Sequence, residues 1–432
     1  MGARQGYKLW NRFGMTRREF LRHFGIATGA ITLSPFIVGR FSQVLALPSI
    51  KVHIVKNGDC FQNIAKLWEM LGGAEIYINP TDIVVIKANA QWPNQGYTHT
   101  GCIKGVIDKI LEIPNFSGEV LVCDNVQNYG TSGRFGFDST LSYRKNNWPD
   151  HNWDSLAAEY QANGEPVGTK RWLNSETDIS GPAEGEGWIR SFFSLHSRNS
   201  YLSYPIFESP LTSGRMIDMK NGVWENGQYT GAKVKTIFMP TLNNHGNGGE
   251  DYAGVTSAIK SFFGATEIHY GQYSKFRDYY NIHSSSFNFN RADYAGELTA
   301  RFINTMYKPN LYITPAMWSG HYSRTGSATE TKTVLACDNP TTLDYIACRD
   351  VISPYAAWLN PDQDNNTRKQ IIGCISGGVG TINPTEYEVI SFDFENPKVS
   401  RLDIDRKIKD LKSGNATEQE VKDLVNSYME TN

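Results

Sequence analysis

The sequence predicts an α/β protein built on a mainly parallel sheet with flanking helices. Residues 82–88 (DIVVIKA) form a continuous apolar, β-branched run, typical of a parallel strand that is buried on both faces. A helical pattern at 101–113 follows, with Ile103, Val106 and Ile110 on one face, and a second apolar run occupies 118–123. Strand, helix and strand in this order predict a βαβ unit with a right-handed crossover.

The other elements are expected around this unit. An amphipathic helix at 59–71 precedes it, and residues 130–230, rich in Trp, Tyr, Asn, Ser and Gly with weak periodicity, predict a large loop-rich insertion. After the insertion the pattern predicts strands at 234–239, 310–314, 333–336 and 386–392, and helices at 252–263, 292–306 and 340–353. A charged helical hairpin is expected at 402–429, broken at Gly414 and capped by Thr417 with Glu420.

Composition excludes several classes of protein. With 432 residues, 40% hydrophobic and 20% charged, the chain is neither disordered nor a coiled coil. It contains no run of ~20 apolar residues, which excludes a protein with several membrane spans. The net charge is −2, but residues 1–46 hold seven basic residues and one acid, leaving 35 basic and 43 acidic residues beyond them. An acidic body argues against nucleic acid as a partner.

The basic N-terminal segment has the pattern of a twin-arginine export signal. Arg17 and Arg18 precede Phe20-Leu21-Arg22, a mildly apolar stretch covers 24–38, and cleavage after Ala46 is expected. We therefore divide the chain into a signal segment (1–46), an α/β domain (47–400) and a helical tail (401–432). The expected partner is the twin-arginine export machinery, the expected location is the periplasm or cell surface, and membrane contact is expected only through an uncleaved signal.

The six cysteines show no metal-binding spacing. No C-x-x-C motif is present, and most of the cysteines lie in apolar runs, which favours small buried hydrophobic side chains over disulfides or iron–sulfur ligands. H-E-x-x-H, G-x-S-x-G, Walker and dinucleotide-binding motifs are also absent from the sequence. A nucleotide cofactor bound in the usual way is therefore not expected.

Three stretches resemble the family catalogued as domain of unknown function 362. They are DIVVIKAN (82–89) with the following helix and strand, MPTLNNHG (239–246) continued by 254–264, and residues 308–344. Ala88 replaces the family's usual proline, and Asn243 and Asn244 replace basic or small residues. A fainter similarity to the lactate racemase superfamily covers His245 to Lys260, where a loop histidine precedes a helix that bears a cofactor-holding lysine.

Polar residues that follow predicted strands are the candidate site. In an open parallel sheet, ligands bind beyond the carboxyl ends of the strands. We assign candidate catalytic roles to Lys87, His245 and Lys260. Candidate ligand-binding residues are Asn89, His99, Asp124, Asn243 and His321.

Structural alternatives stay open for several of these residues. His99 can cap the helix that follows it, Asp124 can cap a turn, and Asp344 can be a helix N-terminal charge. If a metal ion is bound, its candidate ligands are His99, Asp124 and His245, because imidazole and carboxylate are the available donors. The identity of any cofactor is left open.

Three functions compete, and whether the chain is an enzyme is left open. The first is an exported protein with a ligand, metal or cofactor site at the strand ends. The second is a racemase or epimerase, by analogy with lactate racemase. The third is a non-catalytic surface binding or assembly protein that uses the aromatic insertion, with Trp148, Trp153, Trp172 and Trp188 as candidate contact residues.

Overall fold

The computed structural model describes most of the residues that follow the predicted signal. It describes residues 50–126, 135–173, 178–246, 248–268, 275–287, 291–395, 407–408 and 410–431. The export signal and cleavage site predicted at 1–46 lie outside these residues. No helix in the described ranges has the length and apolar character needed to cross a membrane.

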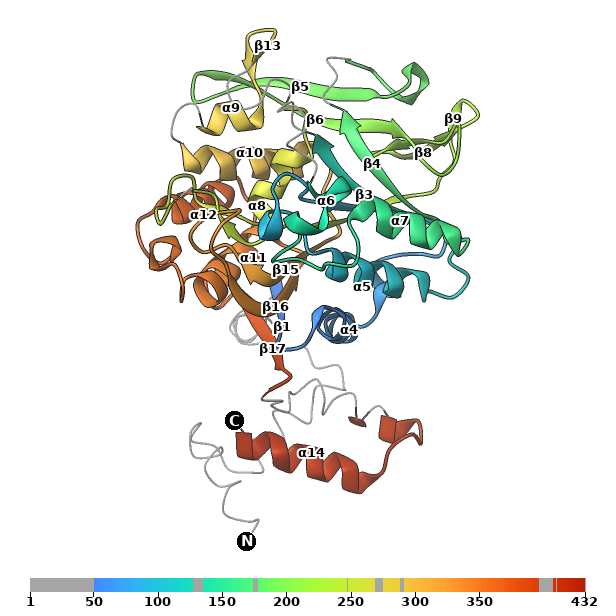
Figure 1. Ribbon diagram of the computed structural model, residues 1–432, viewed down its shortest axis with the longest axis vertical. Helices are drawn as coiled ribbons and strands as arrows, with labels where there is room; N and C mark the ends of the chain where they lie inside the picture. Colours follow the sequence, from blue (N-terminus) through green and yellow to red (C-terminus); the bar gives the residue numbers. More distant parts are fainter. Residues whose placement is uncertain are drawn as a thin grey trace, which may run out of the picture. The chain divides into compact units, whose positions relative to one another are not determined.

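An eight-stranded sheet forms the centre of the body (Figure 1), with the strand order β17-β1-β16-β15-β10-β2-β3-β4. Its strands are β1 (Ile50–Lys56), β2 (Ile83–Ala88), β3 (Glu119–Val126), β4 (Val167–Leu173), β10 (Val234–Met239), β15 (Leu311–Ser319), β16 (Thr329–Cys337) and β17 (Tyr387–Asp393). Every neighbouring pair is parallel except the two that β16 makes with β1 and β15. The predicted α/β class with a mainly parallel sheet is therefore confirmed.

Alternating side chains of the strands enter two hydrophobic cores, one on each face of the sheet. On β2, Val84 and Ile86 pack on one face and Ile83 and Val85 on the other, and all four are buried. The first face is covered by α4 (Cys60–Leu71), α5 (Thr100–Leu111) and α7 (Trp153–Ala162). The second face is covered by α8 (Ala258–Ser261), α10 (Ala292–Thr305), α11 (Pro340–Ala347) and α12 (Asn366–Ser376). Because both faces are covered at the centre of the sheet, β2 is buried at every position from Ile83 to Ala88, as its continuous apolar run indicated.

The predicted loop-rich insertion contains more regular structure than its weak periodicity indicated. Within it, β4 extends the main sheet, α7 packs on that sheet, and the other strands belong to a second, mainly antiparallel sheet. This sheet consists of β5 (Gly187–Leu195), β6 (Arg198–Glu208), β7 (Met216–Asp218), β8 (Gly222–Glu225), β9 (Gln228–Tyr229), β13 (Lys275–Phe276) and β14 (Tyr279–Tyr280). The strands β5 to β9 pair antiparallel with their neighbours in the chain, whereas β14 pairs in parallel with β6. Side chains of β6 enter the core of the main sheet, and the strand is buried at every position from Ser200 to Phe207, so it shows no alternation.

The helix predicted at 252–263 is wrong. Gly254 has φ +73°, and the β-branched pair Val255–Thr256 forms β12, which pairs with β11 (Asn243–Asn244). Helix begins only at Ala258 and lasts one turn before a 3₁₀ turn over Phe262–Gly264. The local β pairing therefore overrides a pattern of apolar residues that suits a helix.

The other helices and strands predicted from the sequence are present in the described residues. Asp59 and Gln62 form a capping box at the start of α4. The second arm of the tail hairpin is α14 (Glu418–Thr431), and Thr417 and Glu420 exchange the hydrogen bonds of the predicted capping box. Part of the first arm lies outside the described residues. All six cysteines are buried and unbridged, in agreement with the interpretation of them as small hydrophobic side chains.

Candidate functional site

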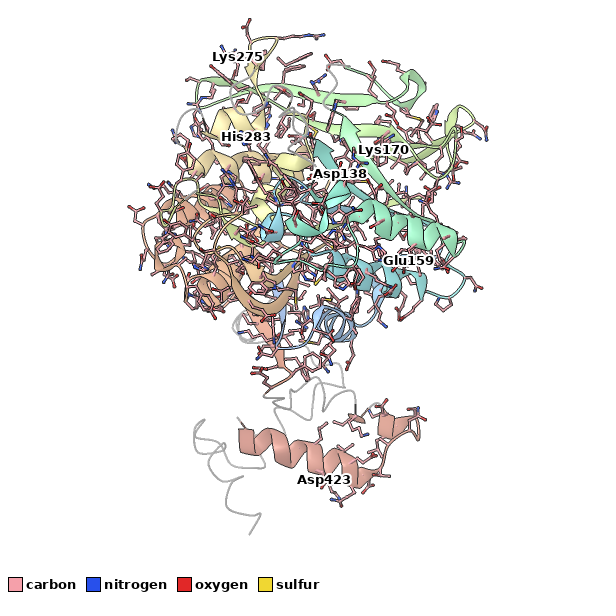
Figure 2. The ribbon with its side chains drawn as sticks, in the orientation of Figure 1. Asp138, Glu159, Lys170, Lys275, His283 and Asp423 are labelled. Carbon is pink, nitrogen blue, oxygen red and sulfur yellow. The ribbon has the colours of Figure 1, made fainter. Side chains whose placement is uncertain are left out.

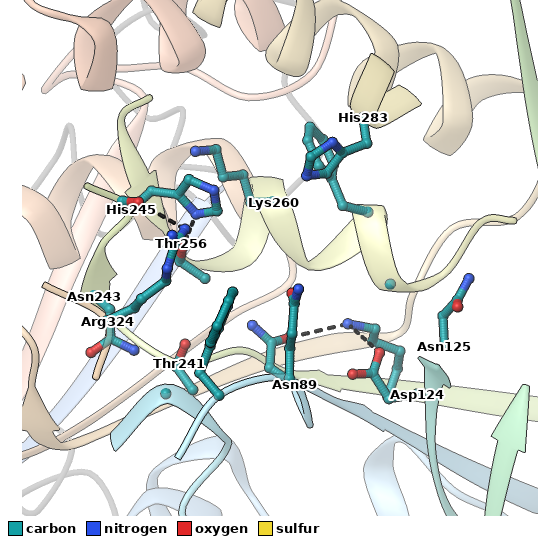
Figure 3. Close-up of a pocket in the computed structure, with 16 residues that line it drawn as sticks. Asn89, Asp124, Asn125, Thr241, Asn243, His245, Thr256, Lys260, His283 and Arg324 are labelled. Atoms are coloured by element: carbon teal, nitrogen blue, oxygen red, sulfur yellow. Dashed lines mark hydrogen bonds and ion pairs between the residues drawn. The ribbon is translucent and has the colours of Figure 1, made fainter. Parts of the chain in front are cut away.

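A pocket opens where four adjacent parallel strands end (Figure 3). The strands β3, β2, β10 and β15 lie side by side, and residues at the end of each strand or in the loop after it line the pocket. It has about 600 Å³ of empty space, including the part that opens to solvent. It is lined by Lys87, Asn89, Gln91, Trp92, Gly96, Asp124, Asn125, Thr241, Asn243, His245, Thr256, Lys260, Phe263, Gly264, His283 and Arg324.

Lys87 and Asp124 form a buried ion pair at the base of the pocket. Lys87 Nζ lies 3.2 Å from Asp124 Oδ1, 3.1 Å from Asn89 Oδ1 and 3.3 Å from Ser261 Oγ. The backbone N–H of Ala90 donates to Asp124 Oδ2 at 2.7 Å. Burial lowers the pKa of Lys87 and raises that of Asp124, while their mutual attraction opposes both shifts. Both strand-end residues are therefore held in place by each other.

Gly264 leaves the room that this ion pair needs. A Cβ atom at this position would lie 2.3 Å from Asp124 Oδ1 and 2.6 Å from Lys87 Nζ. Both distances are shorter than side-chain atoms tolerate without displacement. The 3₁₀ turn that ends at Gly264 can therefore approach the strand ends only because this residue has no side chain.

A carboxylate from another element holds the short helix that bears Lys260. Asp344 on α11 is fully buried, and its two oxygens accept the backbone N–H groups of Ala258 and Ile259 at 2.7 and 2.9 Å. The side chain of Ser257, the residue before the helix, makes no capping hydrogen bond. Asp344 thus supplies from a distance the acceptor that an N-cap residue normally provides, and it does not act at the start of its own helix.

Lys260 is only 5% exposed, and its amine is easily deprotonated. Nζ donates to the backbone oxygen of Ala253, and the residue also lines a smaller pocket with Tyr252, Arg291 and Ala295. Burial, with a smaller contribution from the charge of Arg324, lowers the pKa of Lys260 to about 7 against the raising effects of Asp251 and Asp344. At neutral pH a substantial fraction of this amine is therefore uncharged.

Two neutral imidazoles accompany Lys260. His245 follows β11 and its Nδ1 lies 2.8 Å from Thr256 Oγ1, across the β11–β12 hairpin. His283 projects from α9 (Ile282–Phe287), and Figure 3 shows the two rings on either side of Lys260. Burial lowers the pKa of His245 well below 6.5 and that of His283 to about 3, and the charges of Lys260 and Arg324 add to both shifts. Both rings are therefore proton acceptors at neutral pH.

Arg324 brings a second cation to the pocket. Its guanidinium carbon lies 4.6 Å from the centroid of the Trp92 ring, and Nη1 donates to the backbone oxygen of His245 at 3.0 Å. Burial lowers the pKa of Arg324, but a guanidinium stays charged at any physiological pH. A stacked and oriented guanidinium is suited to bind a carboxylate or phosphate.

Most of the residues predicted from the sequence meet in this pocket. Lys87, Asn89, Asp124, Asn243, His245 and Lys260 all line it. Asn243 is almost fully buried and connects loops, since its amide accepts from the N–H of Gly320 and donates to the backbone oxygen of Gln95. Its amide therefore shapes the rim of the pocket.

Two predicted residues do not reach the pocket. His99 is the N-cap of α5, where its Nδ1 accepts from the backbone N–H of Cys102 at 3.3 Å, and burial lowers its pKa to about 4. His321 lies 3.1 Å from Thr329 Oγ1 through its Nδ1 and is not a lining residue. For His99 the structural alternative, helix capping, is thus the arrangement that the structure shows.

The sequence did not single out Arg324, Trp92 or His283. Arg324 lies three residues beyond His321 in the loop after β15. Ligand sites are expected beyond the ends of parallel strands, but this expectation does not tell which polar residue of a loop lines the site. Trp92 lies in the loop after β2, and His283 lies on a six-residue helix that follows the second sheet, without a pattern that sets it apart.

The candidate metal ligands do not form a cluster among the described residues. Within the described residues, no three His, Cys, Asp or Glu side chains are grouped so that they hold a metal ion. Of the three candidate ligands, Asp124 and His245 line the pocket and His99 does not.

Comparison of the chain with protein-family models, with curated proteins and with solved structures gives no match. The similarity to domain of unknown function 362 therefore stays a prediction from the sequence.

Proposed function

We propose that this protein binds a small organic anion, a carboxylate or phosphate compound, in the strand-end pocket. The observation that carries the proposal is the charge of the lining. Lys87, Lys260 and Arg324 face one carboxylate among the described lining residues, Asp124, and that carboxylate is already paired with Lys87. The described lining residues therefore carry an excess of positive charge, which attracts an anion.

Neutral polar groups complete the binding site. Asn89, Asn125 and Thr241 line the pocket beside the cations, and Trp92 and Phe263 give it apolar surface. Most of the lining residues are polar, so the pocket offers a ligand several hydrogen-bonding groups beside this apolar surface.

The titrating groups support proton transfer on the bound anion. Lys260, with a pKa of about 7, and the neutral His245 can exchange a proton with a ligand held by Arg324. Two such groups in one pocket favour a racemase or epimerase as the more specific form of this proposal, because inversion at carbon needs one group to remove a proton and another to return it. The lactate racemase analogy suggests the same reaction class.

The alternative of a surface binding protein relies on four tryptophans of the insertion, and three of them are buried. Trp153, Trp172 and Trp188 are each at most 2% exposed and belong to the cores, and Trp148 is half-buried. Aromatic side chains in these positions pack the fold and do not present a face to a ligand.

The anion proposal is tested by calorimetric titration of the chain from residue 47 with lactate, pyruvate and inorganic phosphate. We expect saturable binding of at least one, and Arg324→Gln to weaken it by about tenfold or more, since a charge-assisted pair is worth ~1.5–3 kcal/mol. Lys275→Gln, an exposed residue on β13, removes the same charge outside the pocket and is the matched control (Figure 2). Equal affinity in both variants would contradict the proposal.

We also propose that the chain is exported through the twin-arginine pathway, on the strength of Arg17 and Arg18 with the apolar stretch that follows. In a cell that has this pathway, Arg17→Lys with Arg18→Lys should leave the full chain in the cytoplasm. Arg4→Lys with Arg12→Lys, which preserves the charge equally, should not. Export of both variants to the same extent would contradict this proposal.

A further inference from the structure

The pocket contains two buried lysines with different surroundings. Lys87 Nζ has three oxygen partners, Asp124, Asn89 and Ser261, at 3.1–3.3 Å. An ammonium group has three N–H donors, so these partners match a fully protonated Lys87. Lys260 Nζ instead donates to a neutral backbone oxygen, that of Ala253.

Three charged neighbours influence the protonation of Lys260: Asp251 and Asp344 favour its charged form, and Arg324 opposes it. Asp251 accepts the backbone N–H groups of Gly254 and Thr367, and Asp344 accepts those of Ala258 and Ile259. Each oxygen of these two carboxylates thus accepts a hydrogen bond from a backbone N–H group. Arg324, from the loop after β15, opposes a positive charge on Lys260, and His245 and His283 are neutral.

We propose that Lys260 forms an imine with the carbonyl carbon of a 2-oxo acid whose carboxylate binds Arg324. This inference rests on the proposed anion site and names its substrate class, and it gives Lys260 a covalent role in place of the proton exchange described above. A buried lysine among cationic neighbours is a general way to make an amine nucleophilic near neutral pH. Arg324 supplies the carboxylate anchor, and a 2-oxo acid carries its carbonyl carbon directly beside that carboxylate.

The reaction balances with the groups in the pocket. The lone pair of Lys260 Nζ attacks the carbonyl carbon, the new C–N bond forms, and the carbonyl π electrons move to oxygen. One imidazole, His245 or His283, takes a proton from nitrogen and passes it to that oxygen. The resulting carbinolamine loses its hydroxyl with a second proton as water, leaving the C=N bond. No oxidant or reductant is needed.

The experiment is reductive trapping with sodium borohydride. The wild-type chain from residue 47 is incubated with pyruvate, or with lactate as a matched ligand that has a carboxylate but no carbonyl, then reduced, digested and mapped by mass spectrometry. We expect one reduced pyruvate adduct at Lys260, about tenfold or more above any other lysine, with Lys87 unmodified, and no adduct from lactate. Because the mapping uses the wild-type chain, the result does not depend on the folding of a variant.

Two variants and a pH series sharpen the result. Arg324→Gln should lower the adduct yield at subsaturating pyruvate by about tenfold, and Lys260→Arg should abolish it while the chain stays folded by circular dichroism. The yield should rise with pH through about 7, because the neutral amine is the nucleophile. Binding of pyruvate and lactate without an adduct at Lys260 would overturn the imine and leave the anion site standing. Adducts spread over exposed lysines would overturn it too, whereas absence of binding by every anion tested would defeat the proposed function itself.

Discussion

Lys87 Nζ lies 3.2 Å from Asp124 Oδ1, across two adjacent parallel strands, at the base of the pocket. Both side chains are almost fully buried, and the register that pairs Lys87 with Cys123 places Asp124 one residue further along β3. This pair forms the base of the pocket, and Lys260, His245 and Arg324 line the same pocket.

Removal of one partner should destabilise the protein strongly. Lys87→Met leaves Asp124 as a buried unpaired charge, and such changes cost ~3–5 kcal/mol. The double variant Lys87→Met with Asp124→Leu should recover much of that loss, since no charge is then left unpaired. Urea unfolding of the wild type and the variants measures these free energies. A single variant as stable as the wild type would show that the pair does not hold the floor of the pocket.

Gly264→Ala should disturb the ion pair by steric contact alone. The new methyl group would lie within 3 Å of both charged side chains, so one of them has to move, at a cost of ~1–3 kcal/mol in the free energy of unfolding. Gly181→Ala is the matched control, because that residue is extended (φ 176°) and has no neighbour within 4 Å. Equal stability of the two variants in urea would rule out the close approach seen here.

Asp344→Asn should loosen the helix that bears Lys260. An asparagine keeps the size of the side chain but offers a donor where one of two buried N–H groups needs an acceptor, at a cost of ~1–3 kcal/mol. Asp350→Asn removes a half-exposed carboxylate on the turn after the same helix and should cost less than ~1 kcal/mol. Hydrogen exchange at Ala258 and Ile259 reports the effect directly, and unchanged protection there would contradict the capping role.

Lys260→Met should change how stability depends on pH. The pKa of Lys260 is about 7 in the folded chain, below the value of 10.5 for an exposed lysine, so between these values the unfolded chain binds more protons. Wild-type stability therefore gains from this group as pH rises from about 7 towards 10, and below pH 7 the full cost of burying the charge is present. Lys260→Met should exceed the wild type most clearly below pH 7, by on the order of 2 kcal/mol.

This advantage should shrink as the pH rises above 7. Calorimetric or urea unfolding at pH 6 and pH 9 measures it, with Lys275→Met as the exposed control that should show no such trend. A pH-independent difference between Lys260→Met and the wild type would contradict a depressed pKa for Lys260.

Strand ends were the part of the site that the sequence could predict. Lys87 and Asp124 each follow a continuous apolar run, and parallel strands bring such positions to one edge of a sheet. The sequence also points to His245, because a Gly- and Asn-rich loop does not need an imidazole for packing. These inferences depend only on patterns that lie within a few residues.

The missed parts depend on contacts between distant segments. Arg324 reaches the pocket because the loop after β15 is tied to Asn243, 77 residues away, through the N–H of Gly320. The helix predicted at 252–263 is shortened by pairing with β11, and α8 depends on Asp344, 86 residues away. Local periodicity carries no information about such partners. The sequence therefore predicts His321 as the site residue of this loop, whereas Arg324 lines the pocket.

The position of a bound anion tests the central claim most directly. Crystals of the chain from residue 47, grown with selenate as a heavy anion, give an anomalous difference map in which the anion can be located. We expect a peak in the pocket within hydrogen-bonding distance of the Arg324 guanidinium, on the side that faces Lys260, and its loss in crystals of Arg324→Gln. Peaks on the surface with an empty pocket, in crystals that diffract well enough to show them, would contradict an anion site at the strand ends.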